Sequence, residues 1–250
     1  DQHRETLEQV REMASRDTAI ANDDVDALAE DIRASRVDRR VAMEFGSTAD
    51  DLPDREPIVV VSGLPRSGTS MMMQMLAKGG VPAFTDGNRE ADADNPRGYF
   101  EHEKSIKLGS DASWIPEARG HAVKIVAQLL PCLPRGERYR VVFMDRDLLE
   151  IVKSQRVMLD RLEREGGRLT DSRMMSTLDA QVAQIERLLA RRPDVESIFV
   201  DYASVLADPA GETRRIADFL GGDLDVDAMI EGVDATLRNQ GSDRGAAASE

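Results

Sequence analysis

Two glycines and a set of polar side chains stand between a β-branched run and an apolar segment near residue 65. Gly63 and Gly68 enclose a four-residue loop that contains Arg66, and Thr69 and Ser70 follow it directly. Glycines at this spacing let main-chain N–H groups point into a loop, and a helix that follows adds the partial positive charge of its N-terminus. The stretch therefore predicts a cradle for a phosphate group.

The loop departs from the nucleotide-binding P-loop at one position. Its spacing fits G-x-x-x-x-G-K-[ST], but Thr69 stands where that pattern has its lysine. The lysine contacts the β- and γ-phosphates of a nucleoside triphosphate, so its absence removes the main positive charge on the transferred group. Arg66 supplies a cation inside the loop instead. This arrangement suits one phosphate that bears one transferable group.

The segment 63–70, Gly-Leu-Pro-Arg-Ser-Gly-Thr-Ser, resembles the 5′-phosphosulfate loop of sulfotransferases that use 3′-phosphoadenosine-5′-phosphosulfate (PAPS). Many members of that family carry Pro-Lys-Ser-Gly-Thr, whereas tyrosylprotein and many bacterial members carry Pro-Arg-Ser-Gly-Thr. A strand-to-helix turn with glycines for geometry alone is the alternative interpretation. The resemblance implies that the donor is bound by Pro65, Arg66, Ser67, Gly68, Thr69 and Ser70, and that Arg66 is also catalytic.

A second candidate anion site lies after the hydrophobic run 140–145. Arg146 follows this run and Ser154 comes eight residues later. Ligands of open parallel sheets bind at the carboxyl ends of the strands, which is where Arg146 is expected. In the resembled family, an arginine and a serine at this spacing bind the 3′-phosphate of PAPS and of its product, 3′-phosphoadenosine-5′-phosphate (PAP). A guanidinium matches phosphate in two-point fashion, and a hydroxyl adds a donor.

Lys124 is a candidate for stabilising the transferred group. The segment from Lys124 to Leu129-Leu130-Pro131 resembles the Lys-Thr-His-Leu-Pro segment of cytosolic sulfotransferases, in which the lysine contacts the phosphosulfate and the histidine is the general base. Val126 occupies the place of the histidine, so the base must come from elsewhere. A solvent-exposed lysine at a strand end is the alternative interpretation of Lys124.

The candidates for the general base are carboxylates in the stretch 86–119, which has few periodic apolar positions. Within it, Asp94–Glu101 resembles the Asn-Pro-x-Gly-Tyr/Phe-Phe-Glu segment of many bacterial sulfotransferases, and this implies a place in the acceptor pocket. A solvated acidic loop is the alternative. We rank Glu101 first as the base, then Asp86, then Glu90.

The elements that must position these residues alternate between strand and helix patterns. This alternation predicts a three-layer α/β domain with a parallel sheet of about five strands flanked by helices. The resemblance, which covers 58–237, implies the P-loop-containing, nucleotide-kinase-like sulfotransferase fold. We expect an N-terminal helical extension and linker over 1–56, the domain over 57–238 and a flexible tail over 239–250. Strands are expected at 58–61, 81–85, 121–126, 140–145 and 197–202. Helices are expected at 69–78, from 147 onward, at 170–190, and between Asp208 as N-cap and Gly221 as C-terminal stop.

The composition of the chain disfavours several classes of binding partner. The formal net charge of −14 over 250 residues disfavours nucleic acid and anionic membrane surfaces. One cysteine, Cys132, and three scattered histidines predict neither a disulfide nor a metal site. No run of 18 apolar residues and no signal peptide are seen, so we expect no membrane span and a cytoplasmic location.

Together these features predict a sulfotransferase that moves a sulfuryl group from PAPS to a hydroxyl or amine by in-line displacement, without a metal. The acceptor would be a small molecule, a carbohydrate or a peptide hydroxyl. The N-terminal helices would pack on the domain or join copies of the chain into a homo-oligomer. Two other functions stay open: a P-loop nucleotide kinase or NTPase, and a non-catalytic nucleotide-binding module.

Overall fold

One parallel sheet forms the centre of the protein. In this computed structural model, residues 22–41, 54–86, 100–161 and 170–233 are described. The strands lie in the order β2-β1-β3-β4, and every neighbouring pair is parallel. Their bounds are Ile58–Gly63 for β1, Ala122–Lys124 for β2, Tyr139–Asp145 for β3 and Val195–Asp201 for β4.

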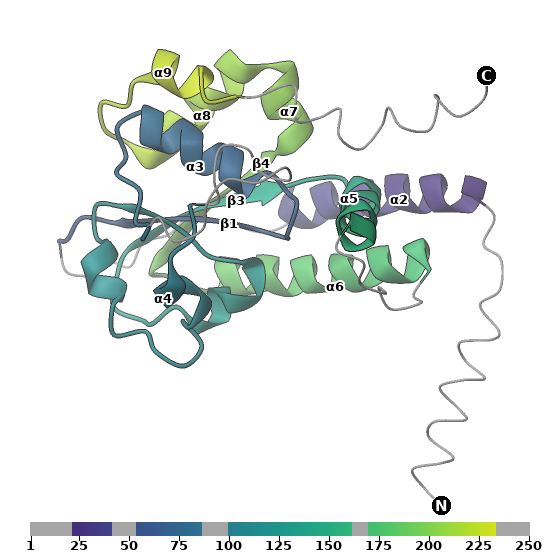
Figure 1. The fold of residues 1–250 in the computed structure, drawn as a ribbon, viewed down its shortest axis with the longest axis horizontal. Coiled ribbons are helices and arrows are strands. Elements are labelled where there is room, and N and C mark those ends of the chain that lie inside the picture. Colours follow the sequence, from purple (N-terminus) through teal and green to yellow (C-terminus); the bar gives the residue numbers. More distant parts are fainter. Residues whose placement is uncertain (1–21, 42–53, 87–99, 162–169, 234–250) are drawn as a thin grey trace, which may run out of the picture.

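Helices cover both faces of the sheet (Figure 1). One face carries α3 (Thr69–Lys78), α7 (Tyr202–Ala207), α8 (Pro209–Leu220) and α9 (Val226–Ile230). The other carries α2 (Asn22–Val41), α5 (Leu148–Arg161) and α6 (Asp171–Ala190). Short helical turns connect the rest: α4 (Glu103–Ile106), η1 (Ile115–Ala118) and η2 (Ala127–Cys132). The predicted three-layer α/β class is confirmed.

Side-chain alternation along the strands explains why both faces are covered. In β1, Ile58 and Val60 enter the core under α5 and α6, whereas Val59 and Val61 enter the core under α3 and α8. Every residue of β1 is buried. A strand buried on both faces requires a continuous hydrophobic run, which is the pattern that the sequence shows here.

The predicted helix ends agree closely with the structure. Thr170 caps α6 through its side chain, and Asp208 caps α8 with Pro209 as the first helical residue. Gly221 ends α8, and α3 ends before Gly79. The methionines of α3 are buried in the core, namely Met71, Met72, Met73 and Met75.

The described part of the chain has four strands where the sequence predicted about five. The segment 81–85 makes a single bridge, between Ala83 and Ala122, and does not continue as a strand. Pro82 has no N–H to donate to a ladder, so it limits pairing to its carbonyl, which accepts from the N–H of Ala122 at 2.8 Å.

Helix α2 packs on the domain of its own chain. Ala29 and Ile32 are buried in the same core as α5 and α6, and α2 contacts both helices. The expected first N-terminal helix, the linker up to residue 53 and the tail over 239–250 lie outside the described residues. Among the described helices, none combines the length and hydropathy that a membrane crossing needs.

Candidate functional site

The loop between β1 and α3 has a backbone that only glycine can easily supply at two points. Gly63 has φ 155° and Gly68 has φ 98°. A Cβ at Gly63 would lie 2.4 Å from Oγ of Ser67, and one at Gly68 would lie 2.5 Å from the ring of Tyr202. Both distances are shorter than real Cβ contacts. The two glycines therefore let the loop fold tightly on itself and against the end of β4.

The loop leaves donors unsatisfied at the start of α3. The described residues supply no side-chain cap for this helix, whose first turn carries N–H groups without intrahelical partners. Ser67 is fully buried, and its hydroxyl has no hydrogen-bond partner among the described residues. An uncapped helix N-terminus beside a buried hydroxyl is suited to an anion.

Arg66 has the left-handed backbone that is uncommon outside glycine, with φ 73°. Its Nε donates to Oγ of Ser154 at 2.9 Å. It forms no ion pair with any carboxylate in the described ranges. The sequence assigned Arg66 and Ser154 to opposite ends of the donor, whereas the structure joins their side chains.

Arg146 extends from the end of β3 toward the same loop. Its Nη1 donates to the main-chain oxygen of Arg66 at 3.1 Å, and its Nε pairs with Glu150 at 2.8 Å. Its guanidinium lies over the ring of Tyr202, with Cζ 4.6 Å from the ring centroid. The structure therefore brings Arg146, Arg66 and Ser154 into one connected cluster.

Lys124 ends β2 on the other side of the loop. It is 9% exposed, and its Nζ lies 3.3 Å from Oγ of Ser70 and 3.2 Å from Oε1 of Glu101. Lys124 is therefore not the solvent-exposed lysine of the alternative interpretation. It links the first turn of α3 to the carboxylate ranked first as a base.

Asp86 is placed differently from Glu101. Its Oδ2 accepts from the main-chain N–H of Glu103 at 2.7 Å and lies 3.5 Å from Nδ1 of His102. This carboxylate therefore holds the start of α4. Glu90 and residues 94–99 lie outside the described residues, so the expected acceptor segment is seen only at Phe100 and Glu101.

Trp114 belongs to the core. It is 2% exposed and stacks on Phe84, with ring centroids 5.4 Å apart, and Phe84 in turn stacks on His102 at 4.7 Å. His102 directly follows Glu101, so the stack adjoins the segment that carries this carboxylate. This packing leaves almost none of the Trp114 side chain exposed to contact an acceptor.

Sequence reasoning did not assign a role at the site to Tyr202. It directly follows β4, is 4% exposed, and contacts Gly68 and the guanidinium of Arg146. Its place after a hydrophobic strand is the signal that could have found it, because the carboxyl ends of parallel strands meet at one edge. Strands β1, β3 and β4 thus lead into residues that contact one another, and β2 ends at Lys124, which contacts Ser70 in the first turn of α3.

A cavity of about 400 Å³ lies at the opposite edge, where β1, β3 and β4 begin. Its lining includes Arg55, Arg138 and Arg140. These arginines pair with carboxylates at 3.3 to 3.6 Å, namely those of Glu137, Asp54 and Glu196. The cavity therefore has less unbalanced positive charge to offer an anion than the loop edge.

No family model matches the chain. No curated protein matches it either. The fold is similar to sulfotransferase domains among solved structures. One is the sulfotransferase domain from the Synechococcus PCC 7002 olefin synthase, with TM-score 0.45, 15% identity, and 79% of this chain and 85% of that chain covered.

Two further structures have lower TM-scores. The sulfotransferase domain from the curacin biosynthetic pathway has TM-score 0.37 and 13% identity, with 66% of this chain and 74% of that chain covered. Retinol dehydratase in a complex with retinol and PAP has TM-score 0.41 and 17% identity, with 72% of this chain and 64% of that chain covered.

Proposed function

We propose that the chain is a sulfotransferase that transfers a sulfuryl group from PAPS to a hydroxyl or amine acceptor. The observation that carries the proposal is the joining of the two candidate anion sites. Arg146 donates to the main chain of Arg66, and Arg66 donates to Ser154. A donor with phosphates at both the 5′ and 3′ positions of one ribose needs two anion sites that lie no farther apart than the two ends of that ribose.

The 5′ end of the donor fits the loop. The uncapped N-terminus of α3, the buried hydroxyl of Ser67 and the hydroxyls of Thr69 and Ser70 are donors for one anionic group. Arg66 adds a cation that no described carboxylate neutralises. Charge-assisted hydrogen bonds of this kind are about twice as strong as neutral ones.

The 3′-phosphate fits Arg146 and Ser154. Nη2 of Arg146 makes no hydrogen bond to a described residue, so it is available to a phosphate oxygen. The hydroxyl of Ser154 accepts from Arg66 and still has its own proton to donate. Tyr202 supports the Arg146 guanidinium from one side.

The reaction needs charge stabilisation at the bond that breaks. When bound, PAPS supplies the sulfuryl group, and negative charge grows on the oxygen that remains with the 5′-phosphate. Arg66 and the loop N–H groups would face this charge before it forms, and Lys124 would add a second cation beside Ser70.

Glu101 is the proposed general base. Its carboxylate lies 3.2 Å from Nζ of Lys124, which itself contacts the first turn of α3. Asp86 is a weaker candidate because it already accepts from the N–H of Glu103. In the proposed role, Glu101 would take the proton of the acceptor hydroxyl as it attacks.

Calorimetric titration tests the donor. The protein would be titrated with PAP, AMP and ATP, each with and without Mg²⁺. The proposal expects PAP to bind more tightly than AMP, independently of Mg²⁺. Binding of ATP that is tighter than that of PAP and depends on Mg²⁺ would instead identify a kinase or NTPase.

Turnover tests the reaction. Labelled PAPS would be supplied with panels of carbohydrate, small-molecule and peptide hydroxyl acceptors, and transfer of label would be measured. Tight binding of PAP without transfer to any acceptor class would favour a non-catalytic nucleotide-binding module.

A further inference from the structure

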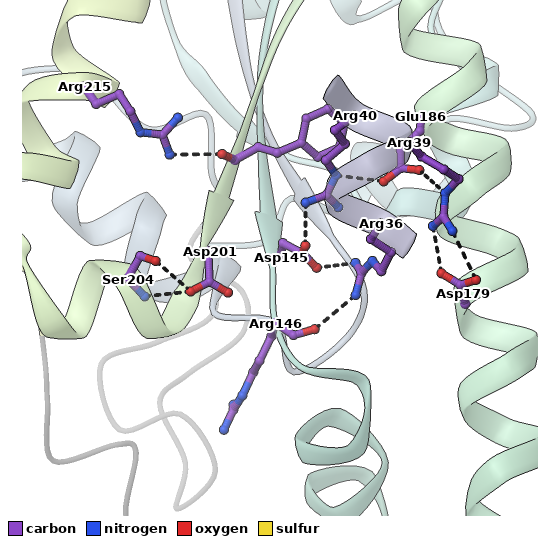
Figure 2. Close-up of polar contacts among 11 residues, drawn as sticks. Arg36, Arg39, Arg40, Asp145, Arg146, Asp179, Glu186, Asp201, Ser204 and Arg215 are labelled. Carbon is purple, nitrogen blue, oxygen red and sulfur yellow. Dashed lines mark hydrogen bonds and ion pairs between the residues drawn. The ribbon is translucent and has the colours of Figure 1, made fainter. Parts of the chain in front are cut away.

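Three arginines of α2 bind the three-residue segment that contains Arg146. Arg33 pairs with Asp147, and Arg36 pairs with Asp145. Nη1 of Arg40 also pairs with Asp145, at 2.6 Å. Figure 2 shows the contacts of Arg36 and Arg40 with Asp145 at the end of β3.

Arg36 reaches the main chain of Arg146 itself. Its Nη1 donates to the carbonyl oxygen of Arg146 in a long contact of 3.5 Å. Positions 33, 36 and 40 are spaced by three and four residues, so they share one face of α2. The helix therefore presents a row of guanidinium groups to a single turn of backbone.

This turn joins β3 to α5. Asp145 is the last residue of β3, and Oδ1 of Asp147 accepts from the main-chain N–H of Glu150 at 3.0 Å in the first turn of α5. The side chain of Arg146 extends away from the α2 arginines in Figure 2. It reaches the carbonyl of Arg66 in the loop instead. The α2 arginines therefore contact Asp145, Asp147 and the main chain of Arg146, whereas the side chain of Arg146 contacts the loop.

Thermodynamic stability is a weak explanation for this arrangement. Arg36 is 4% exposed, and its burial lowers its pKa, an effect that Asp145 opposes. Burying a guanidinium carries a desolvation cost that its ion pair often only offsets, and hydrophobic replacements can be as stable. A buried ion pair is better explained when it holds the backbone in one conformation, here that of the segment 145–147.

We propose that Arg36, with Arg33 and Arg40, is a positioning residue for Arg146, and that helix α2 thereby sets the selectivity for nucleotides that carry a 3′-phosphate. The inference rests on the proposed function, because it takes the 3′-phosphate as the ligand of Arg146. The inference goes further by assigning an effect on nucleotide selectivity to α2, a helix that carries none of the sequence motifs.

The test measures a ratio of affinities. Wild type and Arg36→Met would be titrated calorimetrically with PAP and with AMP, at a temperature at which circular dichroism shows both to be folded. We expect the preference for PAP over AMP to fall by about 2- to 30-fold in Arg36→Met, the range typical of substitutions that act on a site through its neighbours. Arg36→Lys should recover part of the preference.

Arg39→Met is the matched control. Arg39 lies on the same helix and pairs with Asp179 and Glu186, but it does not contact the segment 145–147. Its removal should leave the affinity ratio unchanged. Arg33→Ala covers the case in which Arg36→Met does not fold, because Arg33 is largely exposed and loses only its contact with Asp147. It should lower the ratio by a smaller factor.

The outcomes separate the two proposals. A wild-type protein that prefers PAP, with the same ratio in Arg36→Met and in Arg33→Ala, overturns the positioning role and leaves the proposed function intact. A wild-type protein without preference for PAP overturns both. An equal loss of ratio in Arg39→Met would show a general effect of α2 and would also overturn the specific role of Arg36.

Discussion

The arginines of α2 and the arginine of the β1–α3 loop differ in the partners of their guanidinium groups. Each of Arg36, Arg39 and Arg40 on α2 is paired with at least one carboxylate of the chain. At the loop, Arg66 has a hydroxyl partner and no described carboxylate. The charge of the α2 arginines is neutralised within the fold, whereas no described carboxylate neutralises that of Arg66, to which we assign the ligand in the proposed function.

The carboxylates show the same division. Glu186 is completely buried and bridges Arg39 and Arg40. Glu150, which pairs with Arg146, is 43% exposed. Because the carboxylate side of this pair is open to solvent, water and salt screen it more than the buried pairs of Glu186. The comparison teaches that arginines of neighbouring elements differ in whether a carboxylate of the chain already neutralises them, and the proposed function depends on that difference.

The largest expected effect comes from the loop. Arg66→Ala should lower the rate of sulfuryl transfer by about 10²–10³, the usual cost of losing one group that stabilises transition-state charge. Transfer of label from PAPS would be measured, with a thermal melt to show that the fold is retained. Arg135→Ala, an exposed arginine near the start of β3, is the control and should keep normal turnover. A normal rate in Arg66→Ala would contradict the role.

Arg146→Ala should affect binding more selectively. Hydrogen bonds to charged groups contribute about 1.5–3 kcal/mol, so the affinity for PAP should fall by about 10- to 100-fold. The affinity for AMP, which lacks the 3′-phosphate, should change little. Both would be measured by calorimetric titration. Equal losses for the two nucleotides would remove the assignment of Arg146 to the 3′-phosphate.

Glu186→Gln tests how much the buried ion pairs of the α2 arginines contribute to stability. Each of its arginines keeps a second carboxylate, Asp179 or Asp145, so we expect a loss of about 1–2 kcal/mol in the free energy of unfolding. Urea denaturation would measure it. Glu117→Gln removes an exposed partner of Lys104 and should cost about 0.5 kcal/mol or less. If Glu186→Gln were no more destabilising than Glu117→Gln, buried and exposed pairs would not differ as proposed.

The smallest effect concerns a pair at the opposite edge of the sheet. The hydrogen bond from Arg119 lowers the pKa of Glu137 below its model-compound value of 4.5. A carboxylate with a lowered pKa in the folded state contributes stability above its unfolded-state pKa and loses it as the pH falls through the folded-state pKa. Urea midpoints of wild type and Glu137→Gln should therefore differ above pH 4.5 and converge below it. A difference that stays constant down to pH 3 would contradict this.

Local features of the site could be predicted from the sequence because they depend on neighbouring residues. Gly63 and Gly68 indicate a tight loop since the backbone there needs left-handed or closely packed conformations. The runs that became β1 and β3 were recognised because strands buried on both faces must be continuously hydrophobic. Arg146 was placed at a strand end by the same reasoning.

Contacts between distant segments were decided only by the tertiary structure. With 33 basic and 47 acidic residues in the chain, no spacing rule indicates that Arg36 pairs with Asp145, or that Arg66 reaches Ser154. These partners lie 109 and 88 residues apart. Their meeting depends on the strand order β2-β1-β3-β4 and on the docking of α2 against α5 and α6. The sequence by itself determined the tight loop and the strand ends, because these depend on neighbouring residues, and the packing of the helices decided which arginines are neutralised by carboxylates of the chain.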